Sequence, residues 1–347
     1  VVGRRDSESV TLNTKNLGTD PSRSFLTRLG QSRFFQGDLG MDWRPYDAAK
    51  DRDAVHRVWE EVGWKERENK CHEERLDVFL SAGRVVVAEV NGGVECAVVN
   101  TPGELRYLDT DLSLSCVHAV TTSHVAKRQG LAKRLTAQAV ARDAEEGAEV
   151  AALGMFDQGF YNRLGFGTSS YEHLFHIDPC QLHVDVPFRP PVRFGAEDYE
   201  EVLQCRISRR RGHASCILTE PQMTRADMLG GKDAFGLGYR DGAGGTLSHA
   251  MWIRAESTGA GPYWISWMAC QTTKQLKELL ALLAGLGDQV HLIKLFEPPG
   301  IVLQDLLATP FREMRVREDG QFKLGQKAYA VWQARILDLS KCLSKTH

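Results

Sequence analysis

The sequence predicts an α/β protein with mixed sheets, built as two consecutive units of similar element order and a shorter third segment. β-branched runs such as "RVVVAEV", Arg84–Val90, alternate with helical patterns, which is typical of this class. The tripeptide "NGG", Asn91–Gly93, predicts a tight hairpin between two such runs. A second strand–helix–strand series follows the proline-rich stretch Val184–Phe194, which we interpret as a linker and edge strand.

The first unit has the predicted order β-α-α-β-β-β-α-β-α-β. Met41–Tyr46 is a short edge strand, and Asp47 or Asp51 caps the following helix, which ends at Gly63. The next elements are a helix at Glu73–Ala82, strands at Arg84–Val90, Val94–Thr101 and within Leu112–Thr121, a helix at Leu131–Glu146 and a buried strand at Ala148–Phe156. A short helix, a glycine turn and a last strand complete the unit within Asp157–Asp178.

The second unit repeats this order in a shorter form. Its predicted elements are a helix near Ala196–Ile207, a hairpin around Asp241–Gly245, a strand at Tyr263–Ala269, a helix at Thr273–Leu286 and a strand at Gln289–Phe296. After Glu297, "IVLQDLL" predicts a short helix, and "EMRVREDGQFKLG" and "KAYAVWQARILDL" predict strands.

Composition limits the class of protein further. A length of 347 residues suggests two domains at about 150 residues each. The net charge of −2 provides no basic excess for bulk nucleic-acid binding, and no apolar run approaches the about 20 residues that span a bilayer. The eight cysteines are scattered without close ligand pairs, so we expect reduced thiols in a cytoplasmic protein and no metal site.

The first forty residues differ from the rest of the chain. They are polar, rich in Ser, Thr and Arg, and show no periodicity, whereas a clear pattern begins at Met41. A secretory signal needs an apolar core segment, which these residues lack. We therefore expect residues 1–40 to be a disordered extension, with Met41 near the natural start.

The stretch "AVTTSHVAKRQGLAKRL", Ala119–Leu135, joins an apolar strand end to a helix. Such a junction presents backbone N–H groups and the positive end of the helix dipole to an anion. Gly130 lacks a Cβ where a phosphate would come close, and Lys127 and Arg128 add positive charge. Alone, this pattern also fits an ordinary helix start with solvated charges. The similar run "SRRRGHA", Ser208–Ala214, has no such strand and helix around it, and we interpret it as a surface loop.

The surroundings of this turn resemble the GNAT superfamily of acyl-CoA N-acyltransferases. "KRQGLA", Lys127–Ala132, is similar to the family's phosphate signature Arg/Gln-x-x-Gly-x-Gly/Ala, with lysine in its first position. "FYNRLGFG", Phe160–Gly167, is similar to the family's Tyr-x-x-x-Gly-Phe segment. Both stretches together resemble the enhanced intracellular survival (Eis) type. That resemblance implies a catalytic GNAT domain at 41–183, a degenerate second GNAT domain at 184–298 and the beginning of a truncated sterol-carrier-protein-like domain at 299–347.

The resemblance also implies a site for acetyl-CoA, the co-substrate. The backbone of Val120, Thr121 and Thr122 is expected to pair with the pantetheine arm. The residues expected to hold the pyrophosphate or to contact pantetheine are Arg128, Gln129, Gly130, Leu131, Ala132, Lys133, Phe156 and Asp157. Tyr161 is the candidate general acid, because a phenol of pKa about 10 stays protonated at neutral pH and can donate to a leaving thiolate. Spacing alone favours a core tyrosine at Tyr161, and the motif reverses that interpretation.

The predicted function is therefore transfer of an acetyl group from acetyl-CoA to a primary amine of a small molecule or a lysine. The alternative is a non-catalytic protein that binds or senses acyl-CoA or a lipid, and a weaker one is a scaffold without a CoA site. We interpret His118 and His124, which flank the turn, as structural. No nucleic-acid or membrane partner is expected, and the resemblance suggests a possible homo-oligomer.

Overall fold

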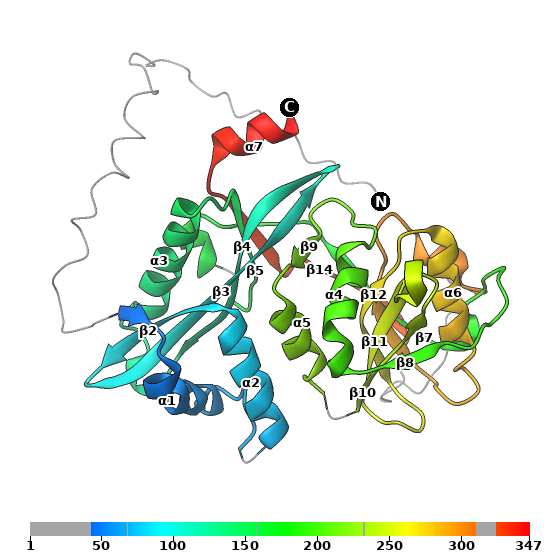
Figure 1. Ribbon diagram of the computed structural model, residues 1–347, viewed down its shortest axis with the longest axis horizontal. Coiled ribbons are helices and arrows are strands. Elements are labelled where there is room, and N and C mark those ends of the chain that lie inside the picture. Colours follow the sequence, from blue (N-terminus) through cyan, green and yellow to red (C-terminus); the bar gives the residue numbers. More distant parts are fainter. Residues whose placement is uncertain (1–42, 68, 158, 232, 310–323) are drawn as a thin grey trace, which may run out of the picture. The chain divides into compact units, whose positions relative to one another are not determined.

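A computed structural model describes residues 43–67, 69–157, 159–231, 233–309 and 324–347 (Figure 1). Its strands form two mixed sheets within the unit Asp42–His347. The first sheet has the order β1 (Trp43–Pro45), β2 (Arg84–Val90), β3 (Gly93–Tyr107), β4 (Thr110–Thr122), β5 (Val150–Gly154), β15 (Trp332–Ile336) and β6 (Gly167–Thr168), with β9 (Cys216–Leu218) paired to β3. In this sheet β4 and β5 are parallel, and the other pairs are antiparallel.

Three helices of the first half pack on this sheet: α1 (Ala48–Glu61), α2 (Lys70–Ala82) and α3 (Leu131–Glu145). Of the two predicted caps of α1, Asp47 is the one observed, and the helix buries Val55, Val58 and Trp59 against β2 and β3. The second helix begins three residues earlier than predicted, because the Asn69 side chain accepts the hydrogen bond that caps it. The predicted bounds of α3 agree with the structure within one residue.

The second sheet has the order β14 (Gly325–Tyr329), β7 (Glu172–Ile177), β13 (Ile293–Phe296), β12 (Tyr263–Ala269), β11 (His249–Ala255), β10 (Ala234–Tyr239) and β8 (Val192–Phe194). Its helices are α4 (Tyr199–Ile207), α5 (Pro221–Met228) and α6 (Thr273–Ala284), and α6 buries leucines in the core of this half. The series β8-β10-β11-β12-β13 repeats β1-β2-β3-β4-β5, again with a parallel last pair. The repeated order predicted from the sequence is thus confirmed.

The two halves exchange strands, which the sequence pattern does not indicate. The strand after the glycine turn, β7, is predicted in the first unit but pairs with β13 in the second sheet. Conversely, β15 is predicted to begin a third domain but lies between β5 and β6 in the first sheet. A period-two pattern identifies a strand but not the strand it pairs with, so neither pairing follows from the sequence. The final helix α7 (Leu339–Thr346) packs against β4 and β5 through buried Cys342.

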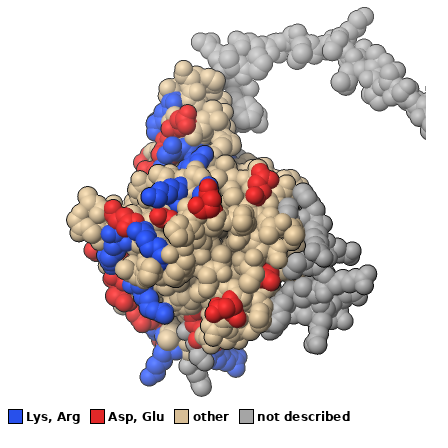
Figure 2. Space-filling view, turned by 90° about the vertical axis from the view of Figure 1, so that its right-hand side faces the viewer, with Lys and Arg blue, Asp and Glu red and all other residues tan. Residues whose placement is uncertain are grey.

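Some expectations concern residues outside the described ranges. These are the disordered extension at residues 1–40 and most of the strand predicted in "EMRVREDGQFKLG". Within the described residues, no helix combines the length and apolar character needed to cross a membrane. Figure 2 shows one face of the molecule, on which basic side chains lie among acidic ones and do not gather into a single basic surface.

Candidate functional site

The end of β4 is distorted and separates from its parallel neighbour. Ala97 is opposite Thr121 and Val99 is opposite His118, so β4 carries one extra residue here, and Ala119 has a left-handed φ of 46°. The pairing of β4 with β5 ends at Val117 and Leu153. Beyond that point β4 continues to Thr122, paired with β3 but no longer with β5. The backbone of residues 118–122 therefore presents an open strand edge toward the gap between the two strands.

This strand end is held rigidly from the other side. The indole Nε1 of Trp59 donates a 3.0 Å hydrogen bond to the hydroxyl of Thr121, and both groups are buried. The thiol of Cys96 lies 3.3 Å from the Thr122 hydroxyl. The amide of Ser123 donates to the carbonyl of Glu95. The predicted residues Val120, Thr121 and Thr122 thus lie on a fixed backbone whose free edge faces the gap.

The start of α3 is open to solvent. Gly130 is its N-cap residue with a φ of 77°, and a Cβ built on it would meet nothing within 4 Å. The first helical hydrogen bond runs from the Arg134 amide to the Gly130 carbonyl. The helix therefore offers no hydrogen-bond acceptor to the amides of its first three residues, which are Leu131, Ala132 and Lys133. This arrangement fits a pyrophosphate, because it offers several N–H groups, the helix dipole and space above a glycine.

Basic and polar side chains surround this helix start. Those of Lys127, Arg128, Gln129 and Lys133 are exposed. Arg128 has a φ of 64°, which is unfavourable for a residue with a Cβ and costs on the order of 1–3 kcal/mol. Gln129 is anchored by a 3.2 Å hydrogen bond from its side-chain nitrogen to the Val125 carbonyl. Two left-handed residues, Arg128 and Gly130, give the turn a concave backbone of the kind that binds anions.

Tyr161 begins a short helical turn after β5. The turn spans Tyr161–Leu164 and ends at Gly165, which has a φ of 83°. The tyrosine side chain is buried, and its ring makes edge contacts with Phe160 and Phe166. Burial raises the pKa of its phenol, and the charge of Asp157 raises that pKa further. No described residue forms a hydrogen bond with its hydroxyl, so the proton remains available to a ligand.

The two predicted pantetheine contacts lie where β5 ends. Phe156 is 87% exposed, and Asp157 is exposed beside it. Since β4 and β5 are parallel, their carboxyl ends lie at the same edge of the sheet. The start of α3 follows β4, and Tyr161 follows β5. The structure therefore brings all the predicted residues to one edge, around the gap between these two strands.

Strand β15 supports the Tyr161 turn, and the sequence does not predict this contact. Arg335 on β15 donates a 2.7 Å hydrogen bond to the Leu164 carbonyl, and Gln333 lies 3.5 Å from the Asn162 side chain. The Met155 amide donates to the Val331 carbonyl. These contacts span about half the chain in sequence, and no local signal indicates them. The last helix, α7, lies at the other end of β4, where Lys345 contacts Thr110 and Glu149.

Two cavities adjoin the β4 bulge. One, of about 750 Å³, lies among α1, α2 and α5 and reaches Ala119. The other, of about 620 Å³, is lined largely by residues of the second half. Both are lined by His118, Arg206, Leu218 and Trp332. Burial lowers the pKa of His118 to about 4, so its imidazole is neutral at pH 7 and is a poor acceptor for an ammonium proton.

The run Ser208–Ala214 is more than a surface loop. Arg211 forms ion pairs with Glu104 on β3 and with Asp111 on β4, at 3.1 and 2.7 Å. The Arg209 guanidinium donates to two backbone carbonyls, and burial lowers its pKa to about 10. This run therefore connects the two halves beside the cavities, which its local sequence does not indicate.

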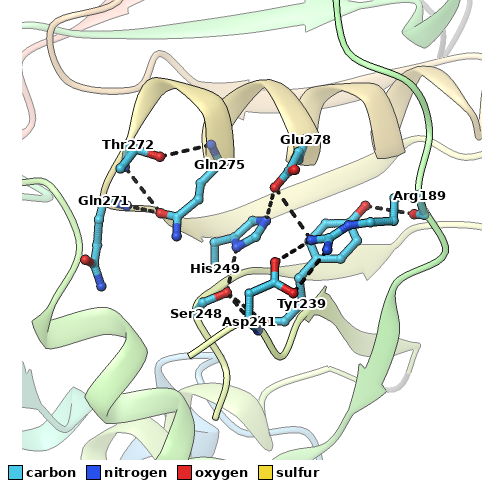
Figure 3. A network of polar contacts seen from close by, with 9 residues as sticks. All are labelled: Arg189, Tyr239, Asp241, Ser248, His249, Gln271, Thr272, Gln275 and Glu278. Atoms are coloured by element: carbon cyan, nitrogen blue, oxygen red, sulfur yellow. Dashed lines mark hydrogen bonds and ion pairs between the residues drawn. The ribbon is translucent and has the colours of Figure 1, made fainter. Parts of the chain in front are cut away.

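A polar network around buried His249 lies in the second half (Figure 3). Asp241, His249 and Glu278 lie close enough together to hold a metal ion. The guanidinium of Arg189, however, pairs with Asp241 at 2.5 Å and with Glu278 at 3.6 Å, and it lies over the ring of Tyr239. Because Arg189 already supplies a cation to both carboxylates, we interpret this network as structural.

Comparison with known proteins agrees with this geometry. Residues 44–169 match the profile of the acetyltransferase (GNAT) domain family. This stretch of the chain is therefore similar to a GNAT acetyltransferase domain. The matched part contains the β4 bulge, the start of α3 and the Tyr161 turn. No curated protein matches the chain in sequence.

Solved structures resemble the chain well beyond residues 44–169. A probable N-acyltransferase of unknown function from Enterococcus faecalis V583 has a TM-score of 0.70 at 14% identity, over 88% of this chain and 74% of that one. Eis1 from Mycobacterium abscessus has a TM-score of 0.64 at 17% identity, over 88% and 75%. A GCN5-related N-acetyltransferase from Kribbella flavida has a TM-score of 0.63 at 14% identity, over 88% and 74%. At these identities the likeness concerns the fold, and it covers both sheets.

Proposed function

We propose that the protein is an N-acetyltransferase that moves the acetyl group of acetyl-CoA to a primary amine. The observation that carries this proposal is the separation of β4 from β5 at a bulge, with an open helix start and a protonated phenol at the same edge. The GNAT domain family supports acyl transfer in general. Acetyl-CoA as the donor and an amine as the acceptor are the specific parts of the proposal.

The chain's own groups suit the binding of acetyl-CoA as substrate. The free edge of Val120–Thr122 supplies backbone donors and acceptors for the two amides of the pantetheine arm. The amides at the start of α3 supply donors for the pyrophosphate, and Arg128 and Gln129 lie beside them. Phe156 offers an exposed ring at the end of β5 for the splayed pantetheine.

In the proposed step the neutral amine attacks the carbonyl carbon of the thioester. A C–N bond forms, the C–S bond breaks, and the thiolate takes the proton of the Tyr161 hydroxyl. The raised pKa of this phenol keeps it protonated before the step. The amine loses its own proton to water, since the low pKa of His118 makes that imidazole a weak base.

The test is an assay of thiol release from acetyl-CoA with a panel of small-molecule amines and lysine peptides, with mass spectrometry of the products. The expected result is thiol release that depends on an amine and yields the acetylated amine. Binding of acetyl-CoA without turnover for any amine would instead favour a non-catalytic acyl-CoA sensor. Absence of any heat in a calorimetric titration with CoA would leave only a scaffold.

Three wider expectations belong to the same proposal. The division at residues 183 and 298 into a catalytic GNAT domain, a degenerate second one and the beginning of a sterol-carrier-protein-like segment stays a prediction. So do a cytoplasmic location and a possible homo-oligomer of Eis type. Sedimentation of the purified full chain would test the oligomer directly.

A further inference from the structure

The larger cavity beside the β4 bulge combines an aromatic wall with arginine side chains. Trp59, Trp64 and Phe79 line one side, and their rings contact one another with centroids 6.0 to 6.5 Å apart through Trp59. Arg75 and Arg206 also line the cavity. Such a surface suits a ligand that has an apolar or aromatic body and a polar end.

The charges of this cavity do not balance. Among the described residues that line it, the one carboxylate is that of Asp227, which pairs with Arg206 at 3.4 Å and with Arg254 at 3.2 Å. Arg75 makes no ion pair or hydrogen bond with any residue in the described part of the chain. Burial lowers the pKa of Arg75 and the like charge of Arg254 lowers it further, while the charge of Asp227, which pairs with two other arginines, raises it. A cationic group is therefore left in the cavity without an anion of its own.

The position of Arg75 is fixed by packing. It lies on α2, which packs closely against α5, and its guanidinium rests against Gly230, where a Cβ would come within 2.9 Å of it. Phe79 follows one helical turn later on the same face of α2. The ring of Phe79 makes an edge contact with His118, which precedes the bulge. Arg75 and Ala119 of the bulge thus line the same cavity, and Phe79 contacts the residue next to the bulge.

We propose that the acceptor of this enzyme is a primary amine that carries a carboxylate at the far end of an apolar or aromatic body. The amine lies at the β4 bulge, the body lies along Phe79 and the tryptophans, and the carboxylate pairs with Arg75. This inference rests on the proposed acetyltransferase function. A planar guanidinium that pairs with a carboxylate gives charge-assisted hydrogen bonds, which are stronger than neutral ones.

Matched amines test the proposal. The probes are 4-(aminomethyl)benzoate and its neutral relatives 4-(aminomethyl)benzamide and 4-methylbenzylamine, together with 6-aminohexanoate and hexylamine. With acetyl-CoA, kcat/KM is expected to be about 10- to 100-fold higher for each carboxylate than for its neutral relative. Equal values for the carboxylates and the neutral amines would overturn the proposal.

Variants connect this preference to one side chain. Arg75→Gln should abolish the preference, chiefly by raising KM for the carboxylates, and Arg75→Lys should restore part of it. Arg225→Gln is the matched control, because Arg225 lies on the exposed side of the same helix pair and contacts Glu74 at 3.2 Å. Calorimetry with CoA should give the same affinity for all three variants and the wild type. An unchanged preference in Arg75→Gln would contradict the proposal.

Two further measurements distinguish failure of the anionic-acceptor proposal from failure of the proposed acetyltransferase function. Succinyl-CoA with 4-methylbenzylamine tests whether the carboxylate belongs to the acyl group; efficient, Arg75-dependent transfer there would overturn an anionic acceptor. If no amine is acetylated at all, the proposed function fails. Calorimetric titration of 4-(aminomethyl)benzoate and of 4-methylbenzylamine into CoA-saturated protein still tests the cavity. Binding that needs both the carboxylate and Arg75 supports the inference without turnover, and its absence contradicts it.

Discussion

The two halves of the molecule share one strand order, but their helices α3 and α6 begin differently. In the first half, α3 starts at Gly130, and the amides of its first turn lie open. In the second half, Thr272 caps α6 by accepting from the Gln275 amide, and the Gln275 side chain accepts from the amides of Gln271 and Thr272 (Figure 3). The same helix position is therefore open to an anion in one half and closed by the chain itself in the other.

The strands before these helices differ in the same way. Both β4 and β12 carry a bulge where pairing with the parallel neighbour ends. In the second half the strand edge is covered, because the Arg210 amide donates to the Cys270 carbonyl. Pro298 and Pro299 also line the small cavity of about 260 Å³ that lies there. The repeat therefore conserves the strand order, while the loops leave the strand edge open in the first half and cover it in the second.

The largest expected effect concerns the phenol at the edge of the first half. Tyr161→Phe should lower kcat about 10²- to 10⁴-fold and leave CoA affinity within about twofold. Because the pKa of Tyr161 is raised above its ordinary value of 10.0, the acid should cause no loss of activity with rising pH below about pH 10. Tyr239→Phe is the control, since that buried tyrosine of the second half also has a raised pKa. An equal kcat for Tyr161→Phe and wild type would contradict the acid role.

A second change makes the start of α3 resemble that of α6. Gly130→Asp places a carboxylate over the open amides, whereas Gly130→Asn adds a side chain of similar shape without charge. Affinity for CoA, measured by calorimetry, should fall on the order of 100-fold for Asp and 10-fold for Asn. The same substitutions at Gly92 are the control, because Gly92 has a φ of 80° and equally open space in a distant hairpin. Equal losses at both glycines would indicate a folding defect and not a lost anion site.

A smaller effect distinguishes half-buried His118 from buried His249. His118 has no hydrogen-bond partner for Nε2 within the described residues, whereas His249 contacts Ser248 and Glu278. The unfolded chain binds a proton at His118 near pH 6.5, but the folded chain does so only near pH 4. The free energy of unfolding should therefore decrease as the pH falls from about 6.5 to 4. His118→Gln should flatten this decrease in urea unfolding curves, and identical curves would refute the assignment.

The smallest effect concerns the capped helix. Thr272→Ala should lower the free energy of unfolding by about 1 kcal/mol, because the Gln275 amide loses its acceptor. It should leave the affinity for CoA unchanged, since α6 has no part in the proposed binding. A tighter or weaker CoA complex in this variant would show that the second half also contributes to the site.

Local signals in the sequence are sufficient for much of the fold and of the site. The β-branched strands, the amphipathic α3 and the glycine at its start each depend on residues close together in the chain. The resemblance that singles out Tyr161 likewise depends on one short segment. Short-range patterns of this kind are therefore enough to predict both the open helix start and the phenol.

The remaining features depend on contacts between distant segments. Arg335 supports the Tyr161 turn from a strand that follows it by about half the chain, and a strand pattern does not identify its partner. Arg75 and Asp227 meet in one cavity only because α2 packs against α5. Each of these residues looks like an ordinary surface charge in the sequence, so their common site becomes visible only in three dimensions.

The central claim is that the amides at the start of α3 bind the pyrophosphate of CoA. The most direct test is the amide NMR signal of Gly130 in ¹⁵N-glycine-labelled protein, assigned by its loss in Gly130→Asn. The signal is predicted to shift on addition of CoA but not on addition of pantetheine, which lacks the phosphates, while the Gly92 signal stays in place. CoA binding that leaves the Gly130 signal unchanged would contradict the account.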